Sequence, residues 1–158
     1  MRNNNPGNIR RNNDVFQGEK TSSDREFKQF KSMAYGYRAV FKILSNYYRN
    51  YKLDTIRKMI GRWAPPKENH TEKYIKAVSD YAGIQANDPI NINDREQMIR
   101  IVAGMSKVEN GREADMPDIR LCKLNCVMLY SHSISSVGER PAPRGGTTRP
   151  DERKITII

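Results

Sequence analysis

The chain has 158 residues, which suits a single domain, and its 37% hydrophobic content is enough for one modest core. Its 28 Lys and Arg against 18 Asp and Glu give a net charge of +10, which favours an anionic partner: nucleic acid, an acidic membrane surface or the anionic bacterial wall. No apolar run approaches the roughly 20 residues needed to span a bilayer, so no membrane span is expected.

The sequence also carries few signals for export or metal binding. The first 14 residues lack the hydrophobic segment of a Sec signal peptide, so we expect synthesis in the cytoplasm and, for action at the cell wall, phage-type release or carriage in a virion. Cys122 and Cys126 lack a second ligand pair, and His70 and His132 lie in no metal-binding motif. We therefore expect no disulfide framework, no metal and no cofactor.

The N-terminal part predicts turns and a small hairpin. Residues 1–14 are rich in Asn, Arg and Gly and have no apolar period, and N-N-N-P-G-N is typical of a turn. The next segment, VFQGEKTSSDREFKQF, predicts a short β-hairpin with strands near residues 15–18 and 26–30.

Helical spacing of apolar residues begins at Tyr35 and continues along residues 37–51, which form one wide apolar face. A second, shorter helix can be capped by Asp54 or Thr55 and ends before a Pro-Pro pair. A third is expected to start at Asn69 or Thr71, and Gly83 is a natural C-cap for it.

A fourth helix is predicted within residues 93–111, which read NDREQMIRIVAGMSKVENG. It opens after Asn93 or Asp94, with Gln97 as a capping-box partner, and Gly111 ends it. The fold class predicted from these elements is mainly α (α+β), with one small β-hairpin.

Glu109 is the most informative residue of this fourth helix. The apolar stripe on which it falls consists of Met98, Ile101, Val102 and Met105. The negative end of the helix dipole and partial burial both disfavour an ionised carboxylate, so both raise its pKa. A carboxyl that stays protonated near neutral pH suits a general acid. The alternative from this segment alone is a solvated glutamate in a frayed last turn.

After the fourth helix the pattern loses consistency. Residues 117–130 could form a short helix or a strand, and residues 131–158, rich in Ser, Pro, Gly and Arg, indicate a flexible basic tail. The segment 118–158 contributes +3 of the net charge, so most of the charge belongs to the compact part. The predicted catalytic domain is residues 1–116.

Three segments together resemble a known class of enzymes: RNNNPGNIR at 2–10, RWAPPKENHTEKYI at 62–75 and VENG at 108–111. The combination resembles small phage-type peptidoglycan hydrolases, including the virion lysins of double-stranded-RNA phages. It is similar, more distantly, to bacterial glucosaminidases and lytic transglycosylases of the lysozyme-like fold. In those enzymes the glutamate helix precedes the Asn-Gly loop, whereas here the loop comes first, which indicates a circular permutation.

The resemblance implies that Glu109 protonates the glycosidic oxygen of the wall glycan. A retaining hydrolase needs a second carboxylate about 5–5.5 Å away, and an inverting one a wider gap. Glu19 is our first candidate, while Asp24 and Glu26 are better explained as polar turn residues of the hairpin. A lytic transglycosylase needs no second carboxylate, because a hydroxyl of the sugar itself closes the ring.

Substrate-binding candidates are Asn4, Asn5 and Asn8, whose amides could bond the glycan or orient the acid, although turn formation is the alternative. Tyr74 matches a tyrosine across from the acid in the related enzymes, and its phenol could bond Glu109 or the substrate. Core packing explains its spacing equally well. Trp63 is assigned to the core.

The sequence thus favours a peptidoglycan-degrading glycosidase, with bacterial cell-wall glycan as its partner. One alternative is a nucleic-acid-binding protein, supported by the basic charge but weakened because the tyrosines of residues 37–51 fall largely on a buried face. Another is a virion structural protein without catalytic activity. The sequence leaves the oligomeric state open.

Overall fold

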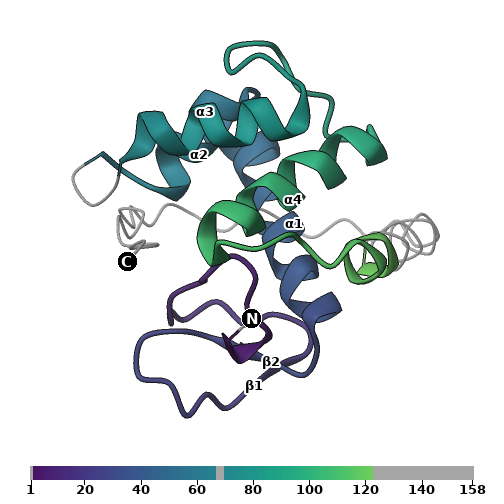
Figure 1. Ribbon diagram of the computed structural model, residues 1–158. Helices are drawn as coiled ribbons and strands as arrows, with labels where there is room; N and C mark the ends of the chain where they lie inside the picture. The colour runs from purple at the N-terminus through teal and green to yellow at the C-terminus, as the bar shows by residue number, and fades with distance from the viewer. Residues whose placement is uncertain (1, 67–69, 123–158) are drawn as a thin grey trace, which may run out of the picture.

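The computed structural model describes residues 2–66 and 70–122. It is mainly helical with one two-stranded antiparallel sheet, which confirms the predicted fold class (Figure 1). The elements in chain order are a 3₁₀ turn η1 (Arg2–Asn4), β1 (Glu19–Lys20), β2 (Gln29–Phe30), α1 (Met33–Tyr51), α2 (Ile56–Trp63), α3 (Thr71–Ala82) and α4 (Arg95–Asn110).

The hairpin is shorter than predicted, and its first strand was placed too early. Gly18 has a φ of 75°, and the backbone N–H of Glu19 donates to the carbonyl of Phe16, so residues 16–19 form a turn and pairing begins only at Glu19. On the other side, residues 26–28 pair with the N-terminal segment: the N–H of Lys28 donates to the carbonyl of Ile9. The N-terminal loop is thereby tied to the hairpin.

The helix ends follow the expected capping chemistry. Thr55, rather than Asp54, caps α2 by accepting from the N–H of Lys58. Gly83 ends α3 and Gly111 ends α4, both in the left-handed conformation that favours glycine.

The two remaining N-termini lie at predicted positions. Helix α3 begins at Thr71, one of the two predicted starts, and His70 in the N-cap position makes no side-chain capping bond. Asp94 caps α4, but the side chain of Gln97 accepts from the N–H of Asn91, so the reciprocal half of the capping box is absent.

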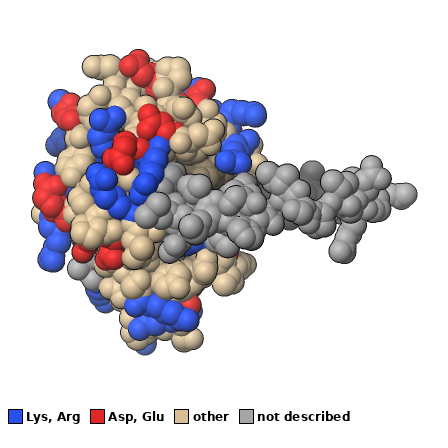
Figure 2. Space-filling model, turned by 90° about the vertical axis from the view of Figure 1, so that its right-hand side faces the viewer, with Lys and Arg blue, Asp and Glu red and all other residues tan. Residues whose placement is uncertain are grey.

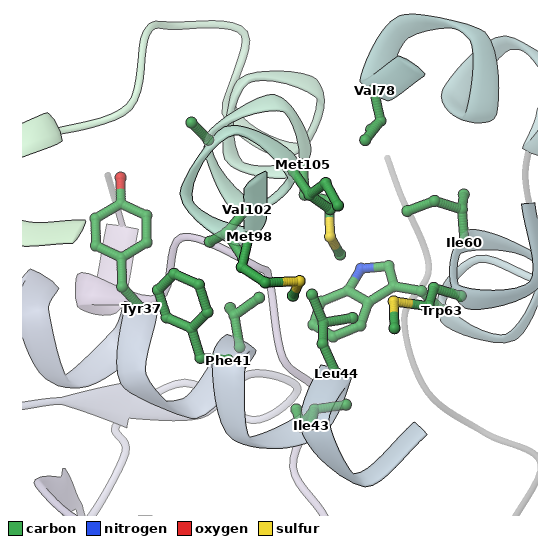
Figure 3. Close-up of a cluster of buried hydrophobic side chains, with 14 of the residues drawn as sticks. Tyr37, Phe41, Ile43, Leu44, Ile60, Trp63, Val78, Met98, Val102 and Met105 are labelled. Atoms are coloured by element: carbon green, nitrogen blue, oxygen red, sulfur yellow. The ribbon is translucent and has the colours of Figure 1, made fainter. Parts of the chain in front are cut away.

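One hydrophobic core joins the helices to the hairpin (Figure 3). The four apolar residues of the predicted α4 stripe are all buried in it. The chain is helical again from residue 116 to residue 122, and Ile119 and Cys122 are buried in the same core. The core therefore continues past residue 116, the predicted end of the domain. The predicted tail, residues 131–158, lies outside the described residues.

Helix α4 occupies the middle of the molecule (Figure 1). Helices α2 and α3 lie on one side of it, the N-terminal loop and the hairpin lie on the other, and α1 runs behind it and contacts both. The C-terminal end of α4, which carries Glu109, therefore lies where these parts of the chain meet.

Two helical glycines predict opposite effects on stability. A Cβ on Gly36 of α1 would lie 2.1 Å from the backbone O of Asn4, whereas one on Gly61 of α2 meets nothing within 4 Å. We expect Gly36→Ala to lower the free energy of unfolding by about 1–3 kcal/mol, because the N-terminal loop must move. Gly61→Ala should raise it by about 0.5–1 kcal/mol through helix propensity. Urea unfolding measures both, and equal shifts would contradict the close packing at Gly36.

Candidate active site

The carboxyl group of Glu109, in the last turn of α4, is surrounded by hydrogen-bond donors from three other segments. The phenol of Tyr74 on α3 donates to Oε1 at 2.8 Å, and the indole N–H of Trp63 at the end of α2 donates to the same oxygen at 3.2 Å. The amide of Asn8 in the N-terminal loop donates to Oε2 at 2.9 Å. The Glu109 side chain as a whole keeps partial exposure. The acid is therefore anchored on three sides in a residue that is not fully buried.

Asn8 holds the glutamate by its backbone as well as by its side chain. Its Nδ2 also donates to the backbone carbonyl of Glu109 at 3.1 Å, and its own φ is 44°, in the left-handed region that asparagine tolerates. Next to it, the amide of Asn110 donates to the carbonyl of Pro6 at 2.8 Å. These bonds attach the N-terminal loop to the end of α4, so residues 101 positions apart build one site.

Trp63 is a site residue that sequence reasoning missed. Its burial was predicted correctly, since it is 0% exposed and lies in the core cluster (Figure 3). Core packing fixes the ring, so its N–H is aimed at Glu109 without rotational freedom. A signal was present in the sequence: a buried indole N–H needs an acceptor, and Glu109 had been placed at the end of an apolar stripe.

Tyr74 forms the bond to Glu109 that was one of its predicted roles. Burial raises the pKa of its phenol well above the ordinary value, and the Glu109 carboxylate raises it further. Tyr74 therefore stays neutral and remains a donor over the whole range in which Glu109 titrates.

Burial raises the pKa of Glu109 from 4.5 to about 7, although the bonds from Tyr74, Asn8 and Trp63 each lower it. Desolvation dominates because it penalises only the charged form. Near neutral pH the group therefore exists as a mixture of acid and carboxylate, the state in which proton donation and acceptance are both easy.

The three donors are distributed unequally over the two carboxyl oxygens. Each oxygen has two lone pairs. Both of those on Oε1 are engaged by Tyr74 and Trp63, whereas among the described residues Oε2 accepts only from Asn8. The neutral acid can therefore carry its proton on Oε2 without breaking any of these bonds. An amide in place of the carboxyl would lack this property, because its N–H₂ would face a donor.

Comparison with known proteins adds a relative from a phage. Protein P5 of Pseudoalteromonas phage PM2 is 38% identical over 115 residues, an alignment that covers 70% of each chain. The chain belongs to the family of this protein. No family model matches the sequence.

In this member of the P5 family, Asn4 and Asn5 do not join the group around Glu109. The amide of Asn4 donates to the carbonyl of Phe30 in β2 at 3.1 Å. Asn5 is 1% exposed, and its side chain bonds the backbone of Ile9 and Lys28. Both therefore fasten the N-terminal loop to the hairpin. The substrate-binding role of Asn5 stays a prediction, and the amide that would serve it is buried and already bonded to backbone groups.

Glu19, the candidate second carboxylate, serves a different purpose. Its Oε1 accepts from the ammonium of Lys28 at 2.8 Å, and its Oε2 accepts from the backbone N–H of Phe16. Lys28 is 2% exposed, and the carbonyls of Asn12 and Asp14 also accept from it. Glu19 therefore neutralises a buried cation, and within the described part of the chain no hydrogen bond or ion pair joins it to Glu109.

The hairpin acids Asp24 and Glu26 were assigned to turns, and Asp24 has that role. Its carboxylate accepts from the N–H of Glu26 and from the amide of Asn3, which lowers its pKa. In residues 2–66 and 70–122 there is no group of His, Cys, Asp and Glu arranged to hold a metal ion. Nor is any helix there long and apolar enough to cross a membrane.

The raised pKa predicts how stability depends on pH. The folded protein holds the Glu109 proton up to about pH 7, whereas the unfolded chain releases it near 4.5, so stability falls as pH rises through this interval. This difference between the pKa values of the folded and unfolded states corresponds to roughly 3 kcal/mol of unfolding free energy. We expect the free energy of unfolding of wild type minus that of Glu109→Gln to decline from about pH 4 to about pH 8. Urea titrations of both proteins test this, and a constant difference would contradict a buried acid.

Tyr74→Phe should raise the Glu109 pKa further, because the lost bond favours the ionised form. A carbon NMR titration of the glutamate carboxyls measures it directly. Tyr81→Phe is the matched control: this phenol, also on α3, donates to Glu113 instead. A pKa lowered by Tyr74→Phe, or moved equally by Tyr81→Phe, would show that the Tyr74 contact has been misassigned.

Proposed function

We propose that the protein is a peptidoglycan-degrading glycosidase that cleaves the glycan strands of the bacterial cell wall, with Glu109 as its general acid. One observation supports this above the others: a desolvated carboxyl whose pKa is near 7, on a residue that is only partly buried, is held by donors from the N-terminal loop, α2 and α3. A structural glutamate needs no such environment. The resemblance of the Asn-rich loop and the VENG helix end to phage-type wall hydrolases supplies the substrate class.

The proposed reaction starts with the neutral acid. Glu109 donates the proton on Oε2 to the oxygen between two amino sugars while the bond from that oxygen to the anomeric carbon breaks. The carboxylate that remains keeps its bonds to Tyr74, Trp63 and Asn8, which stabilise the negative charge without reorganisation.

Two routes can then complete the reaction. Water can attack the anomeric carbon with help from a second carboxylate, or a hydroxyl of the sugar can attack and return its proton to Glu109. The pairing of Glu19 with Lys28 favours the second route, the lytic transglycosylase route, because it needs only one carboxyl. In that route Glu109 is first acid and then base, and a pKa near neutral suits both steps.

The alternative of a virion protein without catalysis would be favoured by an exposed Glu109 distant from the Asn-rich loop. Instead, Asn8 of that loop bonds both the carboxyl and the backbone of Glu109. The nucleic-acid alternative rests on the net charge, and Tyr37 and Tyr47 of α1 are buried, so they offer no stacking platform.

Glu109→Gln should reduce the clearing of purified peptidoglycan by about 100-fold or more, because the amide cannot donate an acidic proton. Glu113→Gln is the control: this exposed glutamate lies four residues away and bonds only Lys107 and Tyr81 among the described residues. Turbidity loss measures activity, with circular dichroism to match folding. Equal activity of wild type and Glu109→Gln would refute the assignment.

The products separate the two routes. A hydrolase leaves new reducing ends, whereas a transglycosylase leaves sugars closed into an internal ring. We expect ring-closed products, and activity that declines as pH rises above about 7 because the acid form is depleted. Reducing ends in proportion to the bonds cut would identify a hydrolase and would require a second carboxylate other than Glu19.

A further inference from the structure

The positive charge of the molecule is concentrated on one stretch of the chain. Residues 31–63, which include α1 and α2, hold eight Lys or Arg and one Asp, a net charge of +7. The rest of the described residues sum to zero. Figure 2 shows one face of the molecule, on which basic and acidic side chains are interspersed. The charge of the described part therefore belongs to one region of the fold.

Within this region, three basic residues share one face of α1, and a fourth caps the C-terminal end of the helix. Arg38, Lys42 and Arg49 recur at steps of four and seven residues, which places them on one side of the helix. Lys52, the C-cap residue of α1, follows directly after its last turn. We call this set the α1 stripe. The sequence of α1 contains no Asp or Glu to neutralise it. Lys42, Arg49 and Lys52 are exposed, and Arg38 is half-buried.

The α1 stripe is separate from the Glu109 site. It lies on the opposite side of α1 from the core-facing residues Val40, Leu44 and Tyr47. The core-facing side approaches the N-terminal loop and α4, where the Tyr37 hydroxyl lies 3.3 Å from that of Ser106. A polymer that bound the stripe would therefore hold the protein without occupying the site.

We propose that the α1 stripe docks the protein onto the carboxylates of the peptide stems of peptidoglycan. This proposal rests on the proposed function, which makes the same wall polymer the substrate. Arg and Lys bind carboxylates directly, and three cations on one face of a helix with a fourth at its C-cap suit a mesh that presents many carboxylates. Nucleic acid is less well matched, because Tyr37 and Tyr47 of α1 are buried and the ring of the exposed Tyr51 is covered by the guanidinium of Arg62, 4.1 Å from the ring centre.

The test compares two variants with the same loss of charge. In the first, Lys42, Arg49 and Lys52 of the stripe become Gln. In the second, three exposed cations scattered over β1, α3 and α4 become Gln, namely Lys20, Lys73 and Arg100. Arg49 has other interactions in the structure, so a Lys42→Gln/Lys52→Gln double variant guards against a folding defect.

Binding is measured by co-sedimentation of full-length protein with purified sacculi at low and moderate salt, both in the wild-type and in the Glu109→Gln background. We expect the stripe variant to lose roughly tenfold or more in affinity at low salt, and the scattered variant less than about threefold. Cleavage of short soluble glycan fragments should be the same for the stripe variant and wild type, because the Glu109 site is intact.

Several results would overturn the proposal. Equal losses for the two triple variants would show that only overall charge matters. A stripe variant that keeps its affinity for sacculi but loses affinity for double-stranded DNA, or for vesicles containing phosphatidylglycerol, would assign the stripe to that other anion. Failure of the proposed function would give a different result, namely that the wild type clears no type of wall. In that case the binding data would still identify the polymer that the α1 stripe binds.

Discussion

The structure depends on the need to satisfy a carboxyl group that is largely removed from water. A buried carboxylate without partners is prohibitively unstable, so donors must be brought to it. Here they come from the N-terminal loop, the end of α2 and the start of α3, and each is a different chemical group: an amide, an indole and a phenol. Glu109 therefore connects three segments of the fold by hydrogen bonds and is also the centre of the candidate site.

This arrangement sets reactivity against stability. The same desolvation that brings the pKa near 7 penalises the ionised group in the folded state. Complete relief would need either more donors or more water, and both would return the pKa toward its ordinary value. The core around Trp63, Leu44 and Met98 supplies stability elsewhere and at the same time holds the indole N–H in place. Trp63 therefore both packs in the core and donates a hydrogen bond to Glu109.

The sequence was most informative where one local rule decides the outcome. Apolar periodicity and glycine C-caps predicted the helices, and the position of an acid on an apolar stripe predicted the burial and the raised pKa of Glu109. It was least informative where an outcome depends on distant partners. Three consecutive asparagines look alike in sequence, yet only the later Asn8 reaches Glu109, because Asn5 is taken up by the hairpin backbone. The ion pair of Glu19 could not be foreseen, because nothing local shows that Lys28, between two phenylalanines, is buried and requires a counter-ion.

The order of the elements has a consequence for how the site assembles. Asn8 and Glu109 are joined across 101 positions, so the first loop of the chain and the last turn of α4 meet only when the intervening helices have packed. Local helical structure can form earlier than this contact, because it needs no such loop closure. Detachment of the N-terminal loop alone would remove the amide of Asn8 and admit water to the carboxyl. Loss of the Asn8 bond would raise the pKa of Glu109, whereas renewed solvation would lower it. Burial is the larger of the two influences, so the pKa would fall. A molecule whose N-terminal loop had detached would therefore hold Glu109 in its ionised form near neutral pH, while its helices remained folded.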